Sequence, residues 1–240
     1  MATTLHKLAD ELSAQGVDAV TLSAPQIRYR STNQSRFSSC MDWRAEICLR
    51  PMGLRSCPAI RGGFVDFLTI RMDEDPIADI LQTLDRRIAH FASLFDGKSI
   101  ADSVAFQFED TTIDTVLLLT RAFVVEPLRG HALGAWMAAE TIHRMLDTFN
   151  GLVVTFPHPP TNAVADISMS AMEAVDRRNR CWHKVGLEPL HQHPGYLGHS
   201  TSHTAIPDAR KTLHKVGHGQ ISAKVHDLRR SLTSPDGADR

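Results

Sequence analysis

A short loop between two regular elements carries the residues of this chain that are best suited to chemistry. The loop, Arg129–Gly134, reads Arg-Gly-His-Ala-Leu-Gly and lies between a strand-like run and a helix-like run. Backbone amides at the start of a helix converge on one point, and the helix dipole adds about half a positive charge there. Arg129 adds a full positive charge. The loop is therefore expected to bind a phosphate or pyrophosphate group.

The segments on either side of the loop have the composition that would position it. Val116–Val125 is almost entirely apolar or β-branched, which is typical of a strand covered on both faces. Pro127 is expected to end this strand, because proline has no N–H to donate to a neighbouring strand. After the loop, a face with three- and four-residue spacing predicts a long amphipathic helix. The residues of that face are Ala138, Thr141, Ile142, Met145 and Phe149.

Two common phosphate-binding patterns do not fit the loop, and the loop resembles a third. A Walker loop needs Lys-Ser or Lys-Thr after its last glycine, and neither follows Gly134. A dinucleotide fingerprint needs glycine at Ala132. The loop resembles the Arg/Gln-x-x-Gly-x-Gly/Ala loop that holds the pyrophosphate of coenzyme A in the GNAT superfamily of acyl-CoA-dependent acyltransferases. It departs from the family at Ala132, usually glycine, and in a Pro127-to-Arg129 spacing one residue shorter than the common form. An ordinary strand–turn–helix with a chance glycine loop is the alternative.

A second stretch, Trp182–Leu187, strengthens this resemblance. It looks like the family's second signature, in which an aromatic residue and a short polar stretch precede a glycine and an apolar residue. A capping box at Ser170–Glu173 predicts that the signature ends a helix. That helix follows a predicted strand at Leu152–Phe156, which is the order found in the family. The two motifs together span Val116–Pro189.

The resemblance implies an α/β (α+β) fold, with a mixed, mostly antiparallel central sheet flanked by helices. In the family, strands four and five separate where the cofactor enters, and the pantetheine arm pairs with the free backbone edge of strand four. By resemblance, Phe123, Val124 and Val125 would line that arm, and an amide near Val125 would polarise the thioester carbonyl. The expected cofactor-binding residues are Phe123, Val124, Val125, Arg129, Gly130, His131, Ala132, Leu133, Gly134 and Trp182.

The implied activity is the transfer of an acetyl or other short acyl group from acyl-CoA to an amine, by direct attack in a ternary complex. The amine must first lose a proton, and Glu126, followed by Glu109, are the candidate bases. Trp182 occupies the position of the family's usual acid, a tyrosine, so the thiolate leaves unaided or another group serves. The alternative is a catalytically inactive GNAT-fold module that binds acyl-CoA or acts in regulation or assembly.

Composition and charge restrict the other function classes. The formal net charge of −1 gives no reason to expect nucleic acid or an anionic membrane as the main partner. No apolar run reaches the length of about 18 residues that a membrane span needs, and the N-terminus lacks a secretory signal pattern. The cysteines, Cys40, Cys48, Cys57 and Cys181, have no CxxC spacing, which predicts free thiols in a cytoplasmic protein. No metal site is expected, and the C-terminal histidines are expected at the surface.

The chain divides into three expected segments. Residues 1–60 form an N-terminal extension, residues 61–206 the acyltransferase domain, and residues 207–240 a helical extension with a disordered tail. The extension is expected to hold a helix that ends at Gly16, strands at Ala19–Leu22 and Ile27–Tyr29, and an irregular segment at Ser31–Ala59.

Other expected elements follow from residue patterns. Strands are predicted at Gly63–Met72, Ser103–Glu109 and Tyr196–Thr204. A long helix is predicted from the Asp75-Pro76 cap to Gly97. Ile221–Leu232 predicts a basic amphipathic helix that docks on the domain or on a second subunit of a homodimer. A doubly wound nucleotide-binding domain is disfavoured, because it needs parallel strands that alternate with helices.

Overall fold

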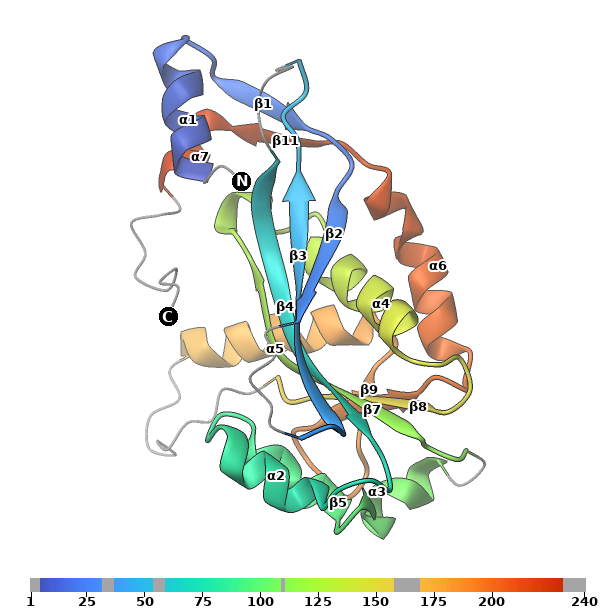
Figure 1. Cartoon of the computed structure of the whole chain (residues 1–240). Coiled ribbons are helices and arrows are strands. Elements are labelled where there is room, and N and C mark those ends of the chain that lie inside the picture. Colours follow the sequence, from blue (N-terminus) through green and yellow to red (C-terminus); the bar gives the residue numbers. More distant parts are fainter. Residues whose placement is uncertain (1–4, 32–36, 54–58, 109–110, 158–168, 231–240) are drawn as a thin grey trace.

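The computed structural model describes residues 5–31, 37–53, 59–108, 111–157 and 169–230 (Figure 1). Its main sheet consists of β2 (Gln26–Ser31), β3 (Cys40–Leu49), β4 (Ile60–Arg71), β7 (Thr115–Val124), β8 (Gly151–Thr155), β9 (Glu188–Pro189) and β10 (Leu197–Ser200). The seven strands lie in the order β2-β3-β4-β7-β8-β10-β9. All neighbours are antiparallel except β7 and β8. The expected mixed, mostly antiparallel sheet in an α/β fold is therefore confirmed.

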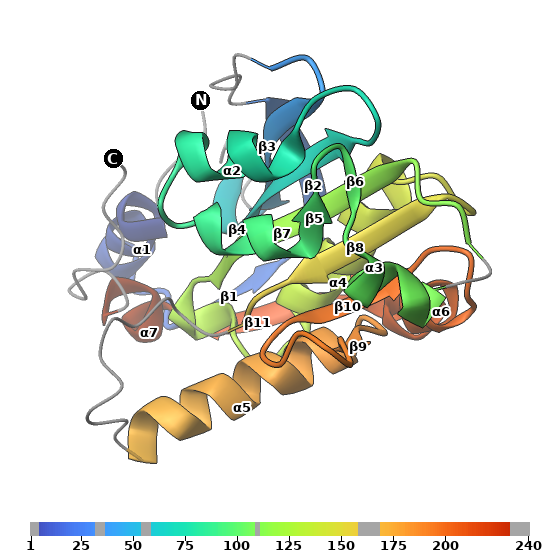
Figure 2. The ribbon, with the colours of Figure 1, turned by 90° about the horizontal axis from the view of Figure 1, so that it is seen from below.

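Helices cover both faces of this sheet, and each face has its own apolar core. One face carries α2 (Ile77–Leu84) and the short helices η1 (Ala89–Leu94), α3 (Asp102–Ala105) and η2 (Phe106–Phe108). The other carries α1 (Leu5–Ala14), α4 (Leu133–Met145), α5 (Met169–His183) and α6 (Ala205–Gly217). Figure 2 shows α2 and α5 on opposite sides of the sheet. In the described part of the chain, no helix is long and apolar enough to cross a membrane.

A second, two-stranded sheet joins the N-terminal and C-terminal parts of the described chain. It pairs β1 (Ala19–Leu22) with β11 (Ile221–Lys224) in antiparallel register. The helix α7 (Val225–Arg230) then lies beside α1, and Arg229 Nε is 3.0 Å from Asp10 Oδ1. A short hairpin, β5 (Phe95–Asp96) with β6 (Ser99–Ile100), completes the strands. The predicted helix at Ile221–Leu232 is thus wrong in its first turn, which is a strand.

The segment predicted to be irregular, Ser31–Ala59, contains the ten-residue strand β3. Charged residues interrupt the alternation of apolar and polar residues that would indicate a strand here. Their ion-pair partners lie on the neighbouring strands. Arg44 makes a bidentate ion pair with Asp66, at 2.6 and 3.0 Å. Glu46 is buried and paired with Arg30 and Arg61. These partners are distant in sequence, so the local pattern could not reveal a strand.

The long helix predicted from Asp75-Pro76 to Gly97 is interrupted. It ends at Leu84, because Asp85 accepts a hydrogen bond from the backbone N–H of Arg87 (2.8 Å) and starts a local turn. The short helix η1 follows this turn. Asp75 is not the expected cap, since it accepts a hydrogen bond from Ser39 Oγ at 2.6 Å.

Two further predictions, a strand at Ser103–Glu109 and a helix that reaches Phe149, are also wrong. Ser103–Glu109 is not a strand: its described part forms α3 and η2, with Val104 and Phe108 buried and Phe106 63% exposed. Val104 and Phe108 are four residues apart, which suits a helical turn as well as a strand. The helix α4 ends at Met145, and Phe149 lies beyond it, 69% exposed.

Candidate functional site

The only parallel strand pair of the described sheet is short. β7 pairs with β8 from Thr115↔Gly151 to Leu119↔Thr155. β7 then continues to Val124, still paired with β4 on its other side. In the part of the chain that the structure describes, no strand pairs with the β8-side edge of β7 beyond Leu119. We call this stretch, Thr120–Val124, the free edge of β7.

A β-bulge marks the start of the free edge. Leu119 pairs with Phe67 and Arg121 pairs with Asp66, so Thr120 is an extra residue on β7. Its hydroxyl donates a hydrogen bond to the carbonyl oxygen of Asp66 at 3.0 Å. A bulge bends a strand and increases its twist. It occurs here next to the point at which β7 and β8 stop pairing.

The direction of the backbone groups shows which amides this edge offers. The N–H of Val125 donates to the carbonyl oxygen of Gly62 on the β4 side, at 3.0 Å. Because bonding directions alternate along a strand, the backbone groups of Ala122 and Val124 point away from β4. The carbonyl oxygen of Val124 indeed accepts a hydrogen bond from Arg129 Nε at 2.9 Å. Among the amides near Val125, those of Ala122 and Val124 therefore face away from β4, whereas the Val125 amide is bonded to it.

The predicted phosphate loop forms a tight connection into α4. The short helix η3 (Glu126–Leu128) follows β7, and Gly130 and Ala132 then both have positive φ, 89° and 57°. The first helical bond of α4 runs from the N–H of Trp136 to the carbonyl oxygen of Ala132, at 2.9 Å. No side chain in the described part of the structure caps this N-terminus. The amides of the first turn are therefore left for another partner.

The loop, the free edge and α5 meet at Gly134. A Cβ atom added there would lie 3.5 Å from Val124 Cγ2 and 3.8 Å from Cys181 Sγ. Burial raises the pKa of the Cys181 thiol, although nearby Lys184 opposes this effect, so the thiol stays protonated at neutral pH. No local sequence signal places Cys181 beside the loop, because α5 is distant from it along the chain.

Arg129 lies over the end of β7. Its guanidinium carbon is 5.8 Å from the ring centre of Phe123, whose ring is 5.6 Å from that of Phe64. Arg129, Gly130 and His131 are exposed, whereas the side chain of Leu133 is buried and can offer a ligand only its backbone amide. The structure thus gathers most of the expected cofactor residues around one corner of the sheet.

The remaining expected residues are placed differently. Trp182 is 6% exposed and packs in the core that α4 covers, which leaves little surface for a ligand. Its carbonyl oxygen accepts hydrogen bonds from the N–H groups of Val185 and Leu187, so the second signature is the C-terminal turn of α5. Glu126 is exposed in η3, directly after β7. Glu109 lies outside the described residues.

The described residues contain no cluster of three or more His, Cys, Asp or Glu side chains that could hold a metal ion. Cys40, Cys48 and Cys181 form no disulfide within the described residues, and Cys57 lies outside the described part. Among the C-terminal histidines expected at the surface, His199 is 8% exposed, and its pKa is lowered by burial. The expectation of a surface position is wrong for that residue.

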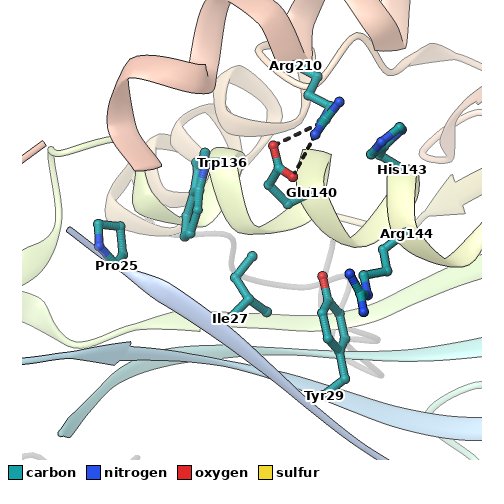
Figure 3. Close-up of a pocket in the computed structure, with 8 residues that line it drawn as sticks. All are labelled: Pro25, Ile27, Tyr29, Trp136, Glu140, His143, Arg144 and Arg210. Carbon is teal, nitrogen blue, oxygen red and sulfur yellow. Dashed lines mark hydrogen bonds and ion pairs between the residues drawn. The ribbon is translucent and has the colours of Figure 1, made fainter. Parts of the chain in front are cut away.

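A cleft of about 690 Å³ lies between the edge strand β2, α4 and α6 (Figure 3). Its lining residues are Pro25, Ile27, Tyr29, Trp136, Glu140, His143, Arg144 and Arg210. This cleft could not be predicted from the sequence, because three segments far apart in the chain form it. The only local signal was the polar positions of α4 beside the apolar Trp136.

No protein-family model matches the chain, and no curated protein or solved structure matches it significantly.

Proposed function

We propose that this protein is an acyl-CoA-dependent N-acyltransferase of the GNAT type. The observation that carries the proposal is the free edge of β7, which lies beside the uncapped N-terminus of α4. In the family, strands four and five separate at this position in the chain order, before the pyrophosphate-binding helix. β7 and β8 have the same order relative to the loop and α4.

The cofactor would bind in two parts. The amide groups of a pantetheine arm would pair with the backbone groups of Ala122 and Val124, which point away from β4. The pyrophosphate would lie against the amides of Gly130–Gly134, where the helix dipole favours negative charge. Arg129 would exchange its bond to the Val124 carbonyl for a charge-assisted bond to the pyrophosphate.

The reaction itself needs few groups from the protein. The neutral amine attacks the thioester carbonyl, a C–N bond forms, and the C–S bond breaks with release of the coenzyme A thiolate. The amine gives up a proton, for which Glu126 is the candidate acceptor in the described part of the chain, and Glu109 is the second candidate. Backbone N–H groups on the free edge would stabilise the oxyanion that forms during the attack.

A second candidate is a module that binds acyl-CoA without catalysis. The residue that favours it is Trp182, a buried indole at the position where the family commonly has an acid. The two candidates share the cofactor site and differ only in turnover.

Isothermal calorimetry with acetyl-CoA tests the cofactor site. We expect wild-type protein to bind, and Arg129→Ala to weaken binding at least about tenfold, because a charge-assisted bond to phosphate contributes about 1.5 kcal/mol or more. Arg86→Ala, at an exposed position beyond α2, removes the same charge and is expected to bind normally. Equal affinities in the two folded variants would show that Arg129 does not hold the pyrophosphate, and lack of binding by wild-type protein would overturn the proposal.

Release of free thiol from acetyl-CoA, followed across a panel of amines, separates the enzyme from the binding module. If Glu126 is the base, Glu126→Gln should lower kcat about 100-fold or more without a comparable loss of acetyl-CoA affinity. Binding without thiol release for any amine would favour the module.

A further inference from the structure

We propose that the cleft of Figure 3 is a second ligand site, which binds a small organic acid with a flat apolar body. The site is separate from the proposed acyl-transfer site, because its residues come from Pro25 and β2, from α6, and from α4 from Trp136 onward. None of them belongs to the free edge of β7 or to the loop before α4.

One end of the cleft is apolar. Figure 3 shows the indole of Trp136 beside Pro25, with Ile27 on the floor between Trp136 and Tyr29. Trp136 and Pro25 are buried, and the side chains of Ile27 and Tyr29 are half-buried. An aromatic or otherwise flat ligand would cover this surface and remove more of it from water. A volume of about 690 Å³ lies within the range of small-molecule sites, roughly 300–1,000 Å³.

The other end is polar, and the one carboxylate among its described lining residues is already paired. Glu140 accepts two hydrogen bonds from Arg210, at 2.9 and 3.1 Å, which joins α4 to α6 and neutralises both charges. A cationic ligand would have to displace Arg210 from this bidentate pair. The cleft therefore offers little to a cation.

Arg144 gives this end its net positive charge. It has no carboxylate partner among the described residues, and its guanidinium carbon lies 5.8 Å from the ring centre of Tyr29. Figure 3 shows the Tyr29 hydroxyl directed towards the part of α4 that carries Glu140 and Arg144. Burial raises the pKa of Tyr29 and outweighs the opposing effects of the Thr141 hydroxyl and of Arg144, so the Tyr29 hydroxyl remains protonated and able to donate. A ligand carboxylate can accept from this hydroxyl while it pairs with Arg144.

A pair of isosteric probes tests the charge preference. We expect 2-naphthoate to bind about fivefold more tightly than the neutral 2-naphthamide, measured by calorimetry and by quenching of tryptophan fluorescence. Arg144→Gln should reduce this ratio to near one and leave 2-naphthamide binding unchanged. Arg86→Gln, which removes the same charge at an exposed position beyond α2, should keep the wild-type ratio.

A blocking variant tests the location. Ile27→Trp places a larger side chain on the cleft floor at a strand position, and it should abolish binding of both probes while circular dichroism and acetyl-CoA binding remain those of wild type. The proposal is overturned if neither probe binds wild-type protein, if the two probes bind equally, or if folded Ile27→Trp binds both normally.

Discussion

Ala132 is one of two non-glycine residues with positive φ in the described chain, the other being Asp73. Its φ of 57° and ψ of 16° lie in the left-handed region, which disfavours a residue with a Cβ atom by about 1–2 kcal/mol. The family that the loop resembles usually has glycine there. The loop thus keeps the backbone shape of a glycine loop despite the alanine, and part of the protein's stability is lost as a result.

We therefore expect Ala132→Gly to raise the free energy of unfolding by about 0.5–1 kcal/mol, since relief of strain exceeds the added entropy of the unfolded chain. For a chain of this size, the melting temperature should rise by roughly 1–4 °C. Ala138→Gly is the control: it changes a buried position within α4 and should lower stability by about 1 kcal/mol. A lower melting temperature for Ala132→Gly would show that the Ala132 side chain contributes contacts that outweigh its strain.

At the scale of single elements, the free edge of β7 is unusual because it lies inside the sheet order rather than at an end. Unpaired N–H and C=O groups on a strand are ready to bind an extended chain. Residue Ala122 offers such a group and has an exposed side chain. A substitution there can change the backbone donor with little effect on the core.

Ala122→Pro removes the N–H that points away from β4, so the β4–β7 ladder loses no hydrogen bond. We expect this variant to bind acetyl-CoA about fivefold to tenfold more weakly in calorimetry, because one backbone bond to the pantetheine arm is lost. Ala122→Val keeps the amide, adds bulk and suits a strand, and should retain most of the affinity. Unchanged binding by folded Ala122→Pro would argue against pantetheine pairing along β7.

The elements that could be predicted from the sequence are those whose signals are local. The strand β7, the loop and most of α4 follow from a continuous apolar run, a proline, glycines and helical spacing. The strand β3 could not be predicted, because Arg44 and Glu46 are stabilised on it by Asp66, Arg30 and Arg61 from other strands.

The same reasoning applies to the candidate site. The loop amides and Arg129 could be named from the motif, but the free edge depends on where β8 stops pairing, which has no sequence signature. The position of Cys181 close to Gly134 and the cleft beside Trp136 both arise from helix packing between distant segments. Tertiary contacts of this kind are not encoded in residue periodicity.

At the scale of the whole molecule, the pairing of β1 with β11 holds the two ends of the described chain together. Val225 N–H donates to the Asp18 carbonyl oxygen at 2.9 Å, and Thr21 lies opposite Ser222. By alternation, Thr21 and Ser222 form a non-hydrogen-bonded pair, in which the side chains are closest. Neither side chain belongs to the buried core.

This register predicts a cross-link. The double variant Thr21→Cys/Ser222→Cys should form a disulfide under mild oxidation, and it should raise the free energy of unfolding by about 2–4 kcal/mol, since the closed loop is long. The gain should disappear on reduction, as measured by denaturant unfolding with and without dithiothreitol. Thr21→Cys with Lys224→Cys is out of register and should not cross-link. Efficient cross-linking of that second pair instead would mean that β11 pairs differently.

The β1–β11 pair also has a consequence for biosynthesis. On the ribosome, β1 with its buried residues Val20 and Leu22 emerges before the main sheet, whereas its partner β11 is translated after all seven strands of that sheet. Until β11 is translated, β1 therefore lacks its partner strand while the main sheet folds. During that time its apolar residues are available to chaperones that bind nascent chains.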